Sequence, residues 1–168
     1  VRAFTRSERF PISGERLTLT SPDGEPIDLG RVGKVTRSSV PASYDYIPVV
    51  PSLAIDADGG WLNVNADTAA SAVAGAVNAD ACYFLTDTPG VLRDIKDPAS
   101  LIPRLTRAEC EGLIRDGVIG GGMIPKVEAC FEALDAGAGR AVILDGRDPF
   151  ALLGEFVADH ASGTEIVK

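Results

Sequence analysis

The sequence has one histidine, three cysteines and no long apolar run among its 168 residues. A transition-metal site needs several imidazole or thiolate ligands close together, and Cys82, Cys110 and Cys130 are far apart without CxxC spacing. The same spacing argues against a disulfide framework and favours small, reduced core residues. No stretch approaches the roughly 20 apolar residues that cross a bilayer, which argues against a membrane partner.

Basic residues are the minority among the charged ones, with 16 Lys and Arg against 24 Asp and Glu and a net charge of −8. Proteins that bind nucleic acid usually present a basic face, so we expect no nucleic-acid partner. A single nucleotide stays compatible with this charge, because one pocket can be locally positive. The 45% hydrophobic content and the length suit a globular domain with a core of its own.

The chain changes character near residue 45. Residues 1–45 are polar and turn-rich, and the alternating run at 17–20 before the Pro-Asp-Gly turn at 22–24 predicts a β-hairpin. Val32 to Val35 predict another strand. We interpret residues 46–168 as an α/β region and expect one domain overall.

Helix signals are strong in the second region. Asn65 suits the N-cap of a helix over residues 66–77. Thr106 and Glu109 form a capping box at the start of a second helix, which Gly117 ends. Two more helices are predicted by apolar stripes: Ile124, Val127, Phe131 and Leu134, then Leu152, Leu153 and Phe156 after Asp148-Pro149.

Short apolar runs predict strands over residues 47–50, 53–55, 81–85, 141–144 and 163–167. Strands that alternate with helices are typical of a mainly parallel sheet sandwiched between helices. We therefore predict the α/β fold class. In such sheets, ligands bind beyond the carboxyl ends of the strands.

A glycine-rich segment precedes the third of these helices. Three consecutive glycines, Gly120, Gly121 and Gly122, lead into a helix that carries Lys126 in its first turn. A cation is unfavourable at a helix N-terminus, whereas the backbone N–H groups there attract phosphate. Lys126 is thus interpreted as a residue that faces an anionic ligand, with a flexible loop and a solvated lysine as the alternative. The absence of a Walker motif excludes a P-loop.

Two other segments lie where a site is expected. Asn63, Asn65 and Asp67 place two amides and a carboxylate at the start of a helix. Amides can bind a carboxylate or carbonyl with fixed geometry, although capping by Asn65 is the simpler alternative. Residues 86–92 directly follow a predicted strand, and a plain Pro-Gly turn is the alternative there.

Together these segments resemble the N-acetylglutamate kinase family, within the amino-acid kinase superfamily. The resemblance covers about residues 28–167 and implies an amino-acid-kinase-like fold. The matching segments are residues 63–67, 85–92, 97–98, 121–130, 145–147 and 163–164.

The resemblance implies transfer of the ATP γ-phosphoryl group to the side-chain carboxylate of N-acetyl-L-glutamate, in arginine biosynthesis, with Mg²⁺ bridging the phosphates and no metal ligand from protein side chains. Lys126 would stabilise the transition state, and Asp67 would organise the catalytic lysines. Asn63 and Asn65 would bind acetylglutamate. The implied ATP contacts are Thr86, Asp87, Thr88, Pro89, Gly90, Val91, Leu92, Val118, Ile119, Gly120 and Met123.

Members of that family begin with a strand that carries a second catalytic lysine before a Gly-Gly turn, and this strand has no counterpart here. The resemblance implies that the chain is the C-terminal nucleotide-binding part, inactive or very weak alone. It would act as a homo-oligomer or with a complementing N-terminal chain, in the cytoplasm, or in a plastid or mitochondrion of a eukaryote. An arginine effector and the PII protein stay open as partners, although His160 and Ala161 depart from the arginine-related pattern.

Two alternatives stay open. A related amino-acid kinase acting on glutamate, aspartate, carbamate or UMP would share the nucleotide loop, but the amides at Asn63 and Asn65 argue against it. A non-catalytic nucleotide- or effector-binding subunit would share the fold, but it would not need both Asp67 and Lys126.

Overall fold

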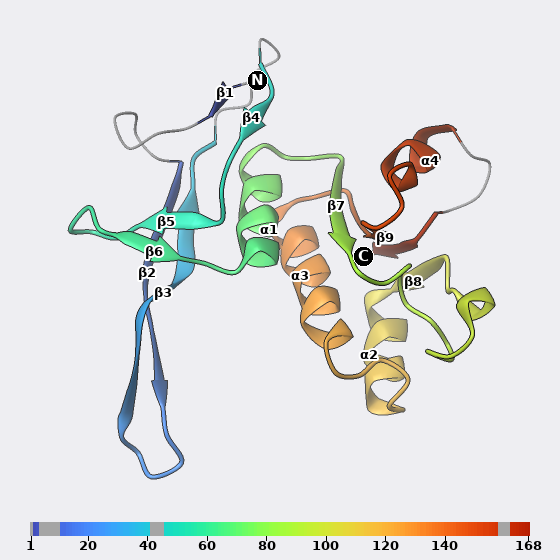
Figure 1. Ribbon diagram of the computed structural model, residues 1–168, viewed down its shortest axis with the longest axis horizontal. Coiled ribbons are helices and arrows are strands. Elements are labelled where there is room, and N and C mark those ends of the chain that lie inside the picture. The colour runs from blue at the N-terminus through green and yellow to red at the C-terminus, as the bar shows by residue number, and fades with distance from the viewer. Residues whose placement is uncertain (1, 4–10, 41–45, 158–161) are drawn as a thin grey trace. The chain divides into compact units, whose positions relative to one another are not determined.

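The computed structural model describes residues 2–3, 11–40, 46–157 and 162–168 (Figure 1). The chain forms two compact units, Val1–Val77 and Asn78–Lys168. The sequence-based division near residue 45 rests on composition and stays a prediction. His160 and Ala161 lie outside the described residues.

The first unit is built on a closed barrel. Its strands are β2 (Ile12–Thr20), β3 (Pro26–Ser38), β6 (Trp61–Asn63) and β5 (Leu53–Ile55), in that order. β2 and β3 pair antiparallel as the predicted hairpin, which Figure 1 shows as a long arm. The separate strand predicted from Val32 to Val35 is wrong in extent, because β3 begins at Pro26 and runs through it. β1 (Arg2–Ala3) and β4 (Pro48–Val49) form a short parallel pair.

Helix α1 (Ala66–Ala76) completes this unit. The Asn65 side chain accepts hydrogen bonds from the N–H groups of Asp67 at 2.8 Å and Thr68 at 3.1 Å, so the predicted N-cap is confirmed. The core that α1 covers consists of buried apolar side chains: Ile12, Ala54, Leu62, Val64 and Ala69.

The second unit contains a four-stranded sheet. The strand order is β7 (Ala81–Thr86), β9 (Arg140–Asp145), β10 (Thr164–Val167) and β8 (Arg104–Thr106). The β7–β9 and β10–β8 pairs are parallel and the β9–β10 pair is antiparallel. The prediction of a mainly parallel sheet is confirmed, and the antiparallel pair shows that the chain returns beside β9 after the short helix α4 (Ala151–Val157).

Both faces of this sheet are covered. Val142 and Leu144 of β9 pack with Ala151 of α4 on one face. Ala141 and Ile143, which point to the opposite face, are also fully buried. α3 (Met123–Ala136) packs against β9 and β7. Burial on both faces explains the continuous apolar run in β9 and confirms the predicted sandwich between helices.

Helix α2 (Arg107–Arg115) has the predicted capping box. The Thr106 N–H donates to Glu109 Oε2 at 2.7 Å, and the Glu109 N–H donates to Thr106 Oγ1 at 3.3 Å. Hydrogen bonds from the Thr106 backbone and hydroxyl lower the pKa of the Glu109 carboxyl. The sequence did not predict β8 or the short 3₁₀ helix η1 (Pro98–Ser100), because neither segment contains a run of apolar residues.

Helix α4 departs from its prediction in two ways. It begins at Ala151 rather than at Asp148-Pro149, where the Asp148 carboxylate instead accepts the Phe150 N–H at 2.8 Å in a turn. Its large apolar side chains are also substantially exposed, with Phe156 at 67%. Across the described ranges, no helix is long and apolar enough to cross a membrane.

The capping box gives a first prediction. Thr106→Ala removes the N-cap acceptor and should lower the unfolding free energy by about 1 kcal/mol, whereas Thr106→Ser should keep most of it. Because the folded-state pKa of Glu109 is lowered, the stabilisation that its carboxylate contributes is present at neutral pH. That stabilisation is lost as pH falls through the folded-state pKa. Denaturant titrations at pH 7 and pH 3 check both statements. Equal losses for the serine and alanine variants would contradict the capping role.

Close backbone packing gives a second prediction. A Cβ at Gly163 would collide with the Ile143 carbonyl oxygen and come within 2.7 Å of Leu144 Cδ2. Gly163→Ala should therefore cost about 1–3 kcal/mol of stability, the range for overpacked interiors. A Cβ at Gly120 meets nothing within 4 Å, so Gly120→Ala is the matched control. Thermal melts of the two variants check this, and similar midpoints would show that the sheet absorbs the methyl group.

Candidate functional site

The predicted site segments of the second unit gather at the carboxyl ends of two parallel strands. β7 and β9 are in register from Ala81 opposite Arg140 to Thr86 opposite Asp145. The chain therefore leaves both strands at one edge, and the Gly146 N–H donates to the Thr86 carbonyl oxygen at 2.6 Å. This is the edge at which α/β sheets bind ligands.

A small polar network shapes the start of the 86–92 loop. The Thr86 hydroxyl lies 3.2 Å from Asp87 Oδ1 and 3.2 Å from Thr88 Oγ1, and it accepts the Thr88 N–H at 3.2 Å. Thr86 is buried, whereas Asp87 is exposed and Thr88 and Pro89 are half-buried. The side chains that can face a ligand are thus those of Asp87, Thr88 and Pro89.

The end of this loop turns inward. Gly90 has a φ of +140°, which favours glycine, and the Val91 side chain is 1% exposed. The Val91 N–H donates to Thr164 Oγ1 at 2.8 Å. Leu92 forms an isolated bridge with Leu101. Residues 90–92 therefore anchor the loop, and the Val91 side chain is a core residue and not a surface for a ligand.

An ion pair that the sequence reasoning did not single out lies at the same edge. Arg147 donates from Nε and Nη2 to the two oxygens of Asp145 at 2.8 and 2.7 Å. These hydrogen bonds lower the pKa of the Asp145 carboxyl to about 2. The usable signal was position, because Asp145 directly follows the strand predicted over residues 141–144 and Arg147 lies two residues later.

The glycine-rich segment leads into the N-terminus of α3. Gly121 has a φ of +52°, but a Cβ at Gly120, Gly121 or Gly122 would meet nothing within 4 Å. Gly122 is the N-cap residue and provides no side-chain cap. Lys126 is the fourth helical residue and is half-buried. The segment is an open stretch of backbone with one cation nearby.

Connectivity places this helix end at the same edge as the 86–92 loop. α3 ends at Gly137, whose φ of +119° turns the chain directly into β9. A helix that precedes a strand and packs on it runs antiparallel to that strand. The N-terminus of α3 therefore lies toward the carboxyl ends of β9 and β7, as Figure 1 shows. Of the residues just before it, Val118 is 40% exposed and Ile119 is buried.

The remaining predicted residues belong to the first unit. Asn63 ends β6 and is exposed, Asn65 caps α1, and Asp67 is half-buried in its first turn. The structure thus brings the two amides and the carboxylate together around one helix start. Asp67 and Lys126 are in different units, so the pairing between them stays a prediction.

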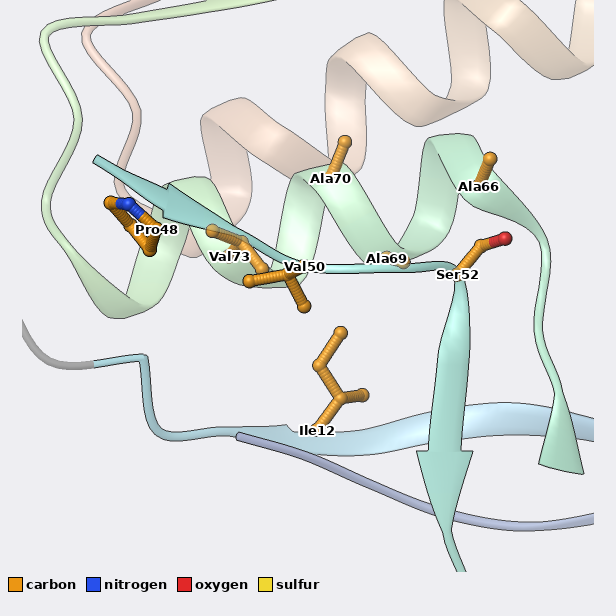
Figure 2. Close-up of a pocket in the computed structure, with 8 residues that line it drawn as sticks. All are labelled: Ile12, Pro48, Val50, Ser52, Ala66, Ala69, Ala70 and Val73. Atoms are coloured by element: carbon orange, nitrogen blue, oxygen red, sulfur yellow. The ribbon is translucent and has the colours of Figure 1, made fainter. Parts of the chain in front are cut away.

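A cavity of about 330 Å³ also lies in the first unit (Figure 2). It opens between α1, β2 and the segment from Pro48 to Ser52, and the Ile12 and Val50 side chains point into it. Among the residues that the structure describes, Ser52 is its only polar lining residue, and no predicted site residue lines it. These described lining residues offer an anion no counter-charge. Within the described part of the chain, no group of three or more His, Cys, Asp or Glu side chains could hold a metal ion.

Comparison with known proteins finds a matching family and several relatives. A model of the amino acid kinase family matches residues 12–145. The acetylglutamate kinase of Anaeromyxobacter dehalogenans (strain 2CP-C) is 50% identical over 145 residues, which are 83% of this chain and 54% of that protein. The acetylglutamate kinase of Methanobrevibacter smithii is 44% identical over 167 residues, which are 96% of this chain and 56% of that protein. The chain spans about half the length of the curated relatives it matches.

Solved structures agree on the fold. The Streptococcus mutans UA159 protein smu.665 superposes with a TM-score of 0.70 at 26% identity, over 99% of this chain and 60% of that one. N-acetylglutamate synthase from Neisseria gonorrhoeae, solved with coenzyme A and L-arginine, superposes with a TM-score of 0.76 at 22% identity, over 95% of this chain and 37% of that one. At this identity the likeness shows the fold alone. The resemblance to acetylglutamate kinases is confirmed by sequence, and with the match over residues 12–145 the chain belongs to the amino acid kinase family.

Proposed function

We propose that this chain supplies the ATP site of an acetylglutamate kinase, which transfers the γ-phosphoryl group of ATP to the side-chain carboxylate of N-acetyl-L-glutamate. The observation that carries the proposal is the shared sheet edge, from which the 86–92 loop emerges and toward which the N-terminus of α3, with Lys126, is directed. Its support from relatives is the 44–50% identity to proteins named acetylglutamate kinase.

The open backbone at residues 120–122 suits the phosphates. Neither Gly120 nor Gly122 needs a positive φ or has a neighbour that a Cβ would strike, so folding does not require glycine at these two positions. Close approach of a ligand to the backbone does require it. The partial positive charge at a helix start favours anions, and an anion bound there would offset the unfavourable placement of Lys126.

Transfer between two anions requires positioning and charge neutralisation more than covalent chemistry by the protein. In the proposed reaction, a carboxylate oxygen of acetylglutamate attacks the γ-phosphorus, the bond to the β-phosphate breaks, and ADP leaves. Lys126 neutralises charge that develops on the phosphoryl group. Mg²⁺ supplies further neutralisation when it is bound to the phosphates.

The 86–92 loop would hold the nucleotide mainly through its outer half. Asp87, Thr88 and Pro89 offer side chains, whereas Val91 and Leu92 keep the loop in place. Val118 offers an exposed apolar surface beside the glycines, and buried Ile119 supports it. The base or ribose would contact these groups.

The first unit would hold the acceptor substrate. Asn65 uses its carbonyl oxygen as a cap, so its NH₂ group is the part that can donate to acetylglutamate. Asn63, exposed at the end of β6, would donate beside it. Asp67 would orient catalytic lysines by charge pairing.

The nucleotide claim gives a third prediction. ATP should raise the melting temperature of the chain, because a ligand that binds only the folded state stabilises it. Lys126→Gln should weaken ATP affinity by about tenfold or more, as expected for the loss of a charge-assisted contact. Lys34→Gln is the control, since Lys34 is exposed and pairs with Glu15 at 2.9 Å in the first unit. Thermal shifts at several ATP concentrations check this, and equal shifts for both variants would argue against the role of Lys126.

The acceptor claim gives a fourth prediction. Mixed with the N-terminal half of the Anaeromyxobacter dehalogenans relative, the chain should form an acyl phosphate from ATP and N-acetyl-L-glutamate. The same mixture made with Lys126→Gln should be about 10²–10³-fold slower, the usual cost of losing one transition-state charge stabiliser. Trapping the product as a hydroxamate measures both rates.

The acceptor panel separates the alternatives. Glutamate, aspartate and carbamate should give background rates, and UMP should give no UDP. A faster rate with one of these acceptors would indicate a related amino-acid kinase. ATP binding without product in any mixture would indicate a non-catalytic nucleotide-binding subunit.

A further inference from the structure

We propose that Thr164 is a positioning residue for nucleotide binding, whose hydroxyl clamps the 86–92 loop onto the sheet. The proposal rests on the proposed function, because it takes that loop to be an ATP contact. Thr164 itself would touch no part of the nucleotide. It would act through the backbone of Val91.

The clamp consists of three short hydrogen bonds around buried groups. The Thr164 side chain is fully buried, and its hydroxyl donates to the Ile102 carbonyl oxygen at 2.7 Å. Thr164 Oγ1 also accepts a hydrogen bond from the Val91 N–H at 2.8 Å. The Val91 carbonyl oxygen in turn accepts the Ile102 N–H at 2.9 Å. Both backbone polar groups of Val91 are thereby held by residues far along the chain.

Glycines on both sides allow this close approach. A Cβ at Gly90 would come within 2.6 Å of Thr164 Oγ1, and the φ of +140° already disfavours other residues there. Gly163 lies so close to the backbone of Ile143 that no side chain fits. The loop and the start of β10 are thus both shaped around one hydroxyl group.

The sheet makes the clamp rigid. Thr164 is the first residue of β10 and pairs with Ile143, a fully buried residue of β9. β9 also pairs with β7, from whose end the loop emerges. The hydroxyl therefore fixes the Val91 end of the loop to β10, while the other end of the loop begins at the end of β7, on the far side of β9. A loop held at both ends loses less conformational entropy when it binds a ligand.

The test compares three variants by ATP titration under conditions where each is folded by circular dichroism. Thr164→Val keeps the shape but leaves the Val91 N–H and Ile102 carbonyl without their partner, and we expect the ATP dissociation constant to rise about tenfold. Thr164→Ser keeps the hydroxyl and should stay within about twofold of the original. Thr106→Ala is the matched control, since it destabilises the same unit at the α2 cap and should leave ATP affinity unchanged.

A readout without ATP separates this proposal from the proposed function. Hydrogen exchange at the Val91 amide should speed up in Thr164→Val and stay slow in Thr106→Ala. If Thr164→Val fails to fold, Gly90→Ala takes its place, because its methyl group disturbs the same contact from the loop side. It should then show the faster Val91 exchange and the weaker ATP binding expected of Thr164→Val. Unchanged Val91 exchange, or equal ATP affinity in the valine and serine variants, would overturn the clamp. Absence of ATP binding by the original chain would overturn the proposed function, whatever the exchange shows.

Discussion

The parallel pairing of β7 with β9 is the constraint on which the candidate ATP site depends. Six residue pairs, from Ala81 opposite Arg140 to Thr86 opposite Asp145, hold the two strands in register. The loops that follow the two strands therefore begin at the same edge of the sheet. A slip of one residue would turn the apolar residues of β9 to the wrong faces, and because both faces are buried, that error would be costly. Core packing thus fixes the register, and the register fixes which loops meet.

Glycine has two distinct tasks in the second unit. Gly90 and Gly163 are required by the protein itself, because a methyl group at either would strike Thr164 or Ile143. Gly120 and Gly122 have open space around them and no left-handed backbone, so nothing in the described chain requires them. Glycine that folding does not require is best explained by something outside the chain that approaches the backbone. This is a physical reason to place phosphates at the start of α3.

Much of the fold was predictable, because caps and periodicity are local signals. Asn65 and the Thr106–Glu109 box marked helix starts correctly, and the apolar run at 141–144 marked a strand covered on both faces. The antiparallel direction of β10 depends on pairing with residues of β9 that lie 21 to 25 positions earlier. The short strand β8 and the clamp at Thr164 depend on contacts between residues more than 60 positions apart, and no local pattern encodes them. The candidate site residues come from motif resemblance, and the geometry separates the exposed residues of the 86–92 loop from those that anchor it.

The candidate site groups of the two units differ in their chemistry. The first presents two amides and a carboxylate around the start of α1, and the amides suit recognition of an N-acylated, anionic acceptor. The second presents open backbone and Lys126, which suits phosphates. Neither set alone can bring an attacking carboxylate to a γ-phosphate, because the reaction needs both anions neutralised and aligned at once. In the proposed enzyme, the groups that would hold ATP and the groups that would hold the acceptor belong to different units, so ATP affinity and acceptor recognition should respond to different substitutions.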